Sequence, residues 1–274
     1  MPVVIQKDIR LESITEPRYS VIITGGGSGI GAATAKRVVA GGGHVGIIDL
    51  NTEMANALKI ELGERAIAVH ADVLDEHQLM AAHETLERKL PTIVGLVNCA
   101  GIPQAPKSIE NYPTEEWWAV VGSHLKGTLI SCREFGSAMA VRGGGAVVNL
   151  ASVMSFRPGP LLAYAPAKAG IVSLTQVLGV QWANRSVRVN AVAPGWTNTP
   201  FLRSGDRNGV RDLTPIIAAT PMGRLIEPEE VAEVIQFLLS SSSSAITGTT
   251  VPCDGGFMAG CGWAPYNSFA DAME

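Results

Sequence analysis

The sequence predicts an α/β protein in which helices cover both faces of a doubly wound, seven-stranded parallel sheet, a three-layer α/β/α arrangement. The first observation is a series of short apolar runs rich in β-branched residues, at residues 20–24, 44–50, 66–70, 93–98, 146–150, 187–192 and 249–252. They are apolar throughout, which is typical of strands buried on both faces. The second observation is the helical period of the segments between them, at residues 31–40, 76–89, 114–141, 164–184 and 228–239. This alternation favours one parallel sheet.

The alternation continues along most of the chain, which predicts a single domain over residues 19–256. An N-terminal extension, residues 1–18, precedes it, and a C-terminal tail, residues 257–274, follows it. The main interruption is a stretch at about residues 196–225 that contains Gly, Pro and Arg. Loops of this length in a compact domain are usually binding loops, so we expect a substrate loop here.

Composition excludes several classes of protein. Hydrophobic residues make up 46% of the 274 residues and charged residues 17%, which predicts a large buried core. The net charge of −4 leaves no basic footprint for nucleic acid and no polybasic patch for a membrane. Apolar runs are too short to span a bilayer, and the N-terminus lacks the apolar core of a signal peptide. The four cysteines have neither CxxC nor metal-ligand spacing, which favours reduced thiols, no metal site and a cytoplasmic protein.

A glycine-rich turn, TGGGSGIG at residues 24–31, follows the first predicted strand and opens a helix. Glycines allow the backbone to turn sharply and to approach a pyrophosphate, whose charge is then stabilised at the helix N-terminus. Taken alone, such a turn is also compatible with a purely structural role. The residues that we expect to contact a dinucleotide here are Gly25, Gly27, Ser28, Gly29, Ile30 and Gly31.

Asp49 stands at the end of the second predicted strand and is followed by Leu50. An acidic residue at this place accepts hydrogen bonds from a ribose 2′-OH and repels a 2′-phosphate. The turn itself contains no Arg or Lys to pair with such a phosphate. The sequence therefore predicts NAD in preference to NADP, although a plain strand-end turn residue remains an alternative for Asp49.

Two further strand ends lie where a ligand across the sheet would pass. Asp72 and Val73 follow the third predicted strand, and the segment NCAG at residues 98–101 follows the fourth. In the second segment we expect Asn98, Ala100 and Gly101 to contact the dinucleotide. From spacing alone, both segments are equally compatible with ordinary loop entries.

Tyr164 and Lys168 stand four residues apart, so a helix places both side chains on one face. Oxidation of an alcohol needs a base, and a tyrosine with its usual pKa of about 10 is too protonated at neutral pH. A nearby ammonium favours the phenolate, and lowering the pKa by about 3 requires roughly 4 kcal/mol. Pro166, between the two, is tolerated in the first turn of a helix, which predicts that the helix begins near Tyr164. An exposed helix pair is the alternative for the two residues alone.

These motifs occur together in one order. They are TGGGSGIG, Asp49, Asp72-Val73, NCAG at residues 98–101, Ser152, the Tyr164-x-x-x-Lys168 pair and PGWTNTP at residues 194–200. Together they resemble the classical short-chain dehydrogenase/reductase family over roughly residues 18–256. The resemblance implies a Rossmann-like single domain, a nicotinamide cofactor and the interconversion of an alcohol and a carbonyl compound.

The resemblance also implies roles for individual residues. Ser152 would bind the substrate oxygen, Tyr164 would act as the general acid/base, and Lys168 would also hold the nicotinamide ribose. Thr199 would contact the nicotinamide carboxamide, beside three further cofactor residues, Pro194, Gly195 and Thr197. By the same analogy, the predicted helices at residues 114–141 and 164–184 would form a homotetramer interface.

The chain departs from the family pattern at two residues, and its C-terminal tail is longer than the family needs. His124 stands where the family usually carries an asparagine that holds a water linked to the lysine, so His124 is predicted to belong to a modified proton relay, a core histidine being the alternative. Cys99 replaces a second common asparagine, and we assign it no chemistry. The tail carries Trp263, Tyr266 and Phe269, which predicts docking on the body or on a neighbouring subunit.

The sequence thus predicts an NAD(H)-dependent oxidoreductase that interconverts a secondary alcohol and a ketone, with a small-molecule substrate. Three alternatives stay open: a non-enzymatic dinucleotide-binding sensor or scaffold, a sugar-modifying epimerase or dehydratase, and a sugar or polyol dehydrogenase as the narrower substrate class. The segments that determine specificity contain no readable code for the substrate.

Overall fold

The computed structural model describes residues 19–204 and 212–261 and contains a seven-stranded, all-parallel sheet in that part of the chain. The strands are β1 (Tyr19–Thr24), β2 (His44–Asp49), β3 (Ala66–His70), β4 (Thr92–Asn98), β5 (Gly145–Leu150), β6 (Val187–Pro194) and β7 (Thr250–Cys253). Their order in the sheet is β3-β2-β1-β4-β5-β6-β7. This doubly wound, Rossmann-like topology confirms the predicted fold class.

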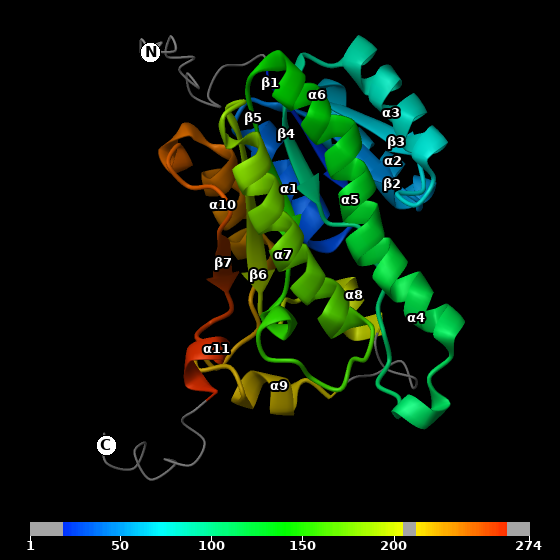
Figure 1. Cartoon of the computed structure of the whole chain (residues 1–274), viewed down its shortest axis with the longest axis vertical. Helices are drawn as coiled ribbons and strands as arrows, with labels where there is room; N and C mark the ends of the chain where they lie inside the picture. The colour runs from blue at the N-terminus through cyan, green and yellow to red at the C-terminus, as the bar shows by residue number, and fades with distance from the viewer. Residues whose placement is uncertain (1–18, 205–211, 262–274) are drawn as a thin grey trace.

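Helices cover both faces of this sheet (Figure 1). One buried apolar cluster joins the sheet to α1 (Gly29–Ala40), α2 (Thr52–Leu62) and α10 (Pro228–Leu239). A second cluster joins the opposite face to α3 (Glu76–Lys89), the long helical segment at residues 114–142 and α7 (Tyr164–Ala183). Large isoleucine and leucine side chains in these two clusters are fully buried, among them Ile22, Ile47 and Leu96. The all-apolar strands are therefore covered on both sides, as their sequences predicted.

The order of the strands reverses between β1 and β4. The chain leaves β1 to one side through β2 and β3 and then returns to pair β4 with the free edge of β1. A crevice forms beyond the carboxyl ends of the strands at such a switch point, and ligands bind there. The glycine-rich turn after β1 and the loop after β4 both lie at this point.

The predicted helix over residues 114–141 is observed as three α-helical segments joined by π-helical turns. They are α4 (Thr114–Val121), α5 (Gly127–Ser131) and α6 (Ser137–Arg142), with π-helical turns at η3 (Gly122–Lys126) and η4 (Cys132–Gly136). The helix α2 was not predicted. Asn51 directly precedes it, and the Asn51 side chain accepts a hydrogen bond from the Met54 amide and so caps the helix.

The predicted substrate loop contains two short helices, α8 (Pro200–Ser204) and α9 (Thr214–Ala218), and the start of the tail forms α11 (Phe257–Gly260). Short 3-10 turns occur at η1 (Gly63–Arg65), η2 (Ile109–Asn111), η5 (Val153–Ser155) and η6 (Ser241–Ser243). The predicted extension and the three aromatic residues of the tail lie outside the described residues. No helix in the described ranges combines the length and apolar character needed to cross a membrane.

Candidate active site

A cavity of about 560 Å³ lies at the carboxyl ends of the strands, next to the switch point. Most of the residues predicted from the sequence lie on its wall. They are Gly25, Ser28, Gly29, Ile30, Gly31, Asp49, Leu50, Asp72, Val73, Ala100, Gly101, His124, Ser152, Tyr164, Lys168, Pro194, Gly195, Thr197 and Thr199. Two predicted cofactor residues, Gly27 and Asn98, lie outside the described wall of this cavity.

The glycine-rich turn contains positions that only glycine can occupy. Gly25 has a φ of 64°, and a Cβ added to it would lie 2.7 Å from the Ala100 backbone. A Cβ on Gly31 would lie 2.2 Å from the carbonyl oxygen of Gly25. The turn therefore closes tightly against the loop after β4 and presents the N-terminus of α1 to the cavity, as binding of a pyrophosphate requires.

Asp49 connects the end of β2 to this turn. One carboxylate oxygen accepts the Gly27 amide at 2.9 Å, and the other accepts the Asn51 amide at 2.9 Å. Gly27 therefore holds the carboxylate instead of lining the cavity. The carboxylate is fixed at the wall by two donors, so the turn role and the ligand role that the sequence left open are compatible.

Asn98 belongs to a buried polar network beneath the cavity. Its side-chain amide donates to Asn149 at 2.8 Å, and the Asn149 amide donates to Thr175 at 2.9 Å. This chain of hydrogen bonds links β4, β5 and α7. The Asn98 side chain is therefore bonded within the fold, and a contact between Asn98 and the cofactor stays a prediction.

The helix α7 begins at Tyr164, so Pro166 lies in its first turn as predicted. The amides of Ala163 and Tyr164 donate to the side-chain oxygen of Gln104, at 3.1 and 2.8 Å. The carbonyl of Leu162, four residues before the proline, accepts the Trp117 indole N–H at 3.2 Å. Side chains of neighbouring segments therefore satisfy backbone groups that the start of the helix leaves unpaired.

Burial raises the pKa of Tyr164, and its hydrogen bond with Ser152 opposes this effect. The sequence predicted a lowered pKa in the presence of Lys168 and a bound nicotinamide, and this stays a prediction. The Lys168 ammonium lies 5.6 Å from the centroid of the Tyr164 ring and donates to the Leu150 carbonyl at 2.5 Å. Burial also lowers the pKa of Lys168 to about 8. The sequence identified the neighbouring charge but not the burial of the phenol.

His124 lies in the π-helical turn η3 and packs its ring edge-on against Tyr164, with ring centroids 5.0 Å apart. Its Nε2 lies 2.9 Å from the Ile102 carbonyl and so carries the proton that it donates there. Nδ1 is then an acceptor, and it is buried without a hydrogen-bond partner in the described part of the chain. Burial, with a smaller effect from the Lys168 charge, holds the pKa of His124 well below its usual value, so the ring is neutral at pH 7.

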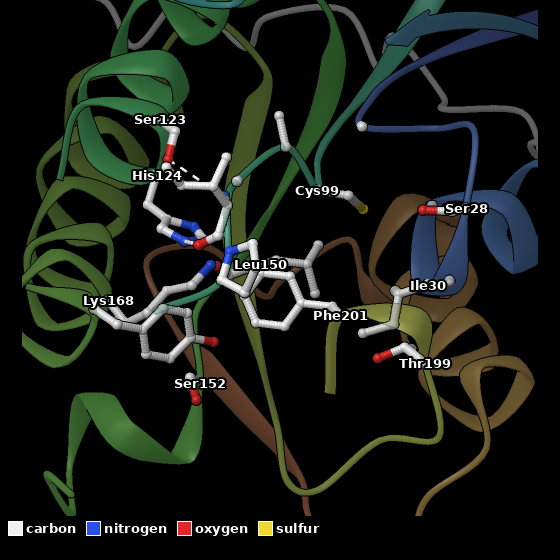
Figure 2. A pocket seen from close by; sticks show the side chains of 18 of the residues that line it. Ser28, Ile30, Cys99, Ser123, His124, Leu150, Ser152, Lys168, Thr199 and Phe201 are labelled. Carbon is white, nitrogen blue, oxygen red and sulfur yellow. Dashed lines mark hydrogen bonds between the residues drawn. The ribbon is translucent and has the colours of Figure 1, made fainter. Parts of the chain in front are cut away.

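The side chains fall into two groups (Figure 2). His124, Lys168 and Ser152 lie together on one side, and Ser28, Ile30 and Thr199 lie on the other. The Phe201 ring lies between them, with its centroid 6.0 Å from that of Tyr164 and 6.2 Å from that of His124. The cavity thus joins a nucleotide-binding end to an end rich in titratable groups.

Sequence reasoning missed the loop that follows β4. Ile102 binds His124, Gln104 binds the start of α7, and both line the cavity. The sequence signals neither contact, because the partners lie 22 to 60 residues away along the chain.

A nicotinamide dinucleotide fits these groups. The glycine-rich turn leaves no room for side chains beside the backbone amides that would hold the pyrophosphate, and the Asp49 carboxylate lines the same cavity, where it would be able to accept a hydrogen bond from a ribose hydroxyl. Thr199 and Lys168 line the same cavity towards its other end. When bound, the cofactor accepts or donates a hydride.

Comparison with known proteins agrees with this geometry. A family model described as enoyl-(acyl carrier protein) reductase matches residues 25–258. Levodione reductase of Leifsonia aquatica is 36% identical over 251 residues, covering 86% of this chain and 92% of that protein. Galactitol 2-dehydrogenase (L-tagatose-forming) of Cereibacter sphaeroides is 35% identical over 240 residues, covering 86% and 93%. The chain spans only 44% of an uncharacterized short-chain type dehydrogenase/reductase of Sinorhizobium fredii, with 34% identity over 245 residues and 89% of this chain covered.

Two solved structures have the same fold. The crystal structure of a ribose-5-phosphate isomerase from Brucella melitensis 16M has a TM-score of 0.88 and 36% identity, covering 92% of this chain and 96% of that one. The structure of 3-ketoacyl-(acyl-carrier-protein) reductase from Brucella melitensis, complexed with NADH, has a TM-score of 0.82 and 34% identity, covering 87% and 98%.

The fold and the site define a Rossmann-like oxidoreductase of the class that binds nicotinamide dinucleotides. More closely, the chain belongs to the short-chain dehydrogenase/reductase family, which confirms the resemblance seen in its motifs.

Proposed function

We propose that this protein is an NAD(H)-dependent oxidoreductase that interconverts a secondary alcohol and a ketone. One observation carries the proposal. Ser152, Tyr164 and Lys168 come from the segment after β5, the start of α7 and its next turn, and they line one cavity with the glycine-rich turn. A nucleotide-binding site alone would not require a phenol, a hydroxyl and an ammonium at its far end.

In this proposal Tyr164 moves the proton. Burial raises the pKa of its phenol, so the group is protonated at neutral pH and can donate to the oxygen of a bound ketone. In the oxidation direction it accepts the hydroxyl proton, and a higher pH favours this step. Ser152, which is coupled to Tyr164 by a hydrogen bond, holds the substrate oxygen.

Lys168 and His124 support this proton transfer. Lys168 is fixed by the Leu150 carbonyl and is protonated below a pKa of about 8, so its charge can stabilise a phenolate during turnover. We assign His124 to the relay as a neutral acceptor, because its unpartnered Nδ1 can bind a water or another donor on the way from Lys168 to solvent. Its lowered pKa argues against a relay through an imidazolium.

NAD is the proposed cofactor because Asp49 presents a fixed carboxylate where a 2′-phosphate would otherwise lie. The NADH complex of the 3-ketoacyl-(acyl-carrier-protein) reductase supports a nicotinamide dinucleotide in this fold. The site residues proposed for the cofactor are those of the glycine-rich turn, Asp49 with Leu50, Asp72 with Val73, Ala100 with Gly101, and the Pro194–Thr199 segment.

The substrate is proposed to be a small alcohol or ketone, and polyols are the narrower candidates because one relative is named a galactitol 2-dehydrogenase. An isomerase is a candidate because of the name of one structural relative, but isomerisation has no evident use for the dinucleotide wall. A non-enzymatic sensor is the third candidate.

One experiment separates these candidates. We expect the protein to oxidise secondary alcohols with NAD, followed by NADH absorbance, and Tyr164→Phe to lower kcat by about 10³-fold or more because it removes the general acid/base. Binding of NADH, measured by fluorescence, should persist in Tyr164→Phe. If wild type binds NADH but turns over no alcohol or ketone, the sensor is favoured. Isomerisation of a sugar phosphate without net NADH formation favours the isomerase.

We also propose a cytoplasmic homotetramer. Val141, Val177 and Val180 are 84%, 58% and 80% exposed on α6 and α7, and Trp118 and Leu129 extend this apolar face along α4 and α5. Faces of this kind are commonly covered in assemblies. The four cysteines are free, which suits a reducing compartment.

A further inference from the structure

Gln104 lines the cavity, and the proposed reaction assigns it no role. It lies in the loop after β4, and only 7% of its surface is exposed. Its Oε1 accepts two hydrogen bonds from the start of α7, at 3.1 Å from the Ala163 amide and 2.8 Å from the Tyr164 amide. Because both partners are donors, the atom between them must be the oxygen of the side-chain amide. The orientation of the Gln104 amide is therefore determined.

The other end of this amide has no partner. Nε2 carries two N–H groups, is buried, and has no acceptor among residues 19–204 and 212–261. An unpaired buried donor destabilises a protein, and buried polar groups are nearly always paired. Gln104 lines the same cavity as Ser152 and Tyr164, and this cavity is where a bound molecule could supply the missing acceptor.

We propose that Gln104 is a positioning and specificity residue with one function at each end of its amide. Oε1 holds the first turn of α7 and, through it, Tyr164. Nε2 donates to a second oxygen of the substrate, so the substrate class is alcohols and ketones that carry a further hydroxyl or carbonyl group. This inference rests on the proposed alcohol–ketone activity and adds the substrate class to it.

In this proposal the same Gln104 side-chain amide binds both the start of α7 and the substrate. A substrate oxygen bound at Nε2 is one rigid amide group away from the backbone of Tyr164. Gln104 therefore fixes the position of the second substrate oxygen relative to Tyr164, the residue that moves the proton. A substrate fits when the distance between its second oxygen and its reacting carbon matches this arrangement. A substrate without that oxygen leaves Nε2 unpaired and is discriminated against.

Two variants separate the two ends of the amide. Gln104→Glu retains an oxygen that accepts the Ala163 and Tyr164 amides, and these donors and the helix N-terminus stabilise its ionised form. It removes the donor. Gln104→Met has a similar size and removes both functions. Gln181→Glu is the matched control, because it makes the same chemical change at an exposed position near the other end of α7.

Each variant is assayed with NAD and four alcohols: cyclohexanol and its 1,2-, 1,3- and 1,4-diol counterparts. For at least one diol, we expect Gln104→Glu to lower the ratio of kcat/KM for the diol to that for cyclohexanol by about tenfold, the change that the loss of one hydrogen bond produces. Gln181→Glu should retain the wild-type ratio. On cyclohexanol, Gln104→Met should have a kcat about tenfold below that of Gln104→Glu, which shows rescue by the retained acceptor. Thermal unfolding checks that each variant is folded.

The outcomes distinguish this inference from the function on which it rests. If wild type oxidises these alcohols but the ratio is the same in wild type and Gln104→Glu for every diol, the donor role is wrong and the function stands. If Gln104→Glu and Gln104→Met have equal kcat on cyclohexanol, the positioning role is wrong. If wild type oxidises none of the four alcohols, the proposed function for this class fails and the inference fails with it.

Discussion

Gly101 offers a test of whether the histidine at the site is held as the structure shows. A Cβ added at this position would lie 2.0 Å from Cε1 and 2.1 Å from Nδ1 of His124, and its third-nearest contact belongs to the same ring. Gly101 does not have a positive φ, so its backbone conformation is open to alanine. The obstacle to Gly101→Ala is therefore the His124 imidazole.

The size of the effect follows from what the ring must give up. To admit a methyl group, His124 must leave the Ile102 carbonyl at 2.9 Å and its edge-on contact with Tyr164 at 5.0 Å. A neutral hydrogen bond contributes about 0.5–1.5 kcal/mol, and an aromatic pair contributes a similar amount. We therefore expect Gly101→Ala to lower the free energy of unfolding by roughly 1–3 kcal/mol, which is also the usual range for overpacking.

A double-mutant cycle isolates this interaction. In a His124→Ala background the ring is gone, so Gly101→Ala should cost less than about 0.5 kcal/mol. The assay is urea unfolding followed by circular dichroism, with Tm as a second measure at roughly 2–4 °C per kcal/mol. Gly144→Ala is the control, because a Cβ there meets nothing within 4 Å.

The four proteins of this cycle (wild type, Gly101→Ala, His124→Ala and the double variant) also test the proposed relay when ketone reduction is measured. His124→Ala and Gly101→Ala should both lower kcat, since one removes and the other displaces the Nδ1 acceptor. An equal cost of Gly101→Ala with and without His124 would refute the packing argument. Unchanged kcat in His124→Ala would remove His124 from the relay.

Two further predictions concern the ends of the cofactor site. Lys168 is protonated below a pKa of about 8 and neutral above it, so kcat/KM for NADH should fall as the pH rises through about 8. Lys168→Arg should move this limb upward, because a guanidinium stays charged; an unmoved limb would assign it to another group. Asp49→Asn retains an acceptor oxygen but removes the charge, so the kcat/KM ratio of NADP to NAD should rise about tenfold or more. The control is Asp254→Asn, since Asp254 also accepts two backbone amides after a strand but does not line the described cavity. Equal ratios in both variants would contradict the role of Asp49.

The strands were predictable because each is a run of apolar residues that must be buried on both faces. All seven observed strands begin and end within two residues of the predicted runs. The π-helical turns in the α4–α6 segment were not predictable, because they depend on how the segment packs against its neighbours. Gly127 shows this dependence, since a Cβ there would lie 2.7 Å from Val73 on another element.

The glycine-rich turn, Asp49 and the Tyr164–Lys168 spacing were readable because local spacing determines their geometry. The burial of individual polar side chains could not be predicted from local spacing. Arg188 lies within the apolar run of β6, yet its guanidinium is buried and donates to the carbonyls of Leu238, Leu239 and Ser240 at the end of α10. The same holds for Tyr164: spacing shows that a charge is near but not how much water is excluded.

The loop after β4 unites the features that the sequence left unexplained. Ile102 accepts from His124, its amide donates to Ser123 at 3.3 Å, and two residues later Gln104 holds the start of α7. This loop therefore connects the π-helical turn to the helix that carries Tyr164. A change at His124 cannot be confined to the relay, because the same loop positions the proton donor and, by our inference, the substrate. His124, which replaces the family's usual asparagine, forms one structural unit with Gln104 and with Gly101, the glycine that leaves room for its ring. A double-mutant cycle of Gly101→Ala and Gln104→Met should therefore show a coupling free energy of at least about 0.5 kcal/mol. If the changes in the free energy of unfolding caused by the two substitutions are strictly additive, the loop does not couple Gly101 to Gln104.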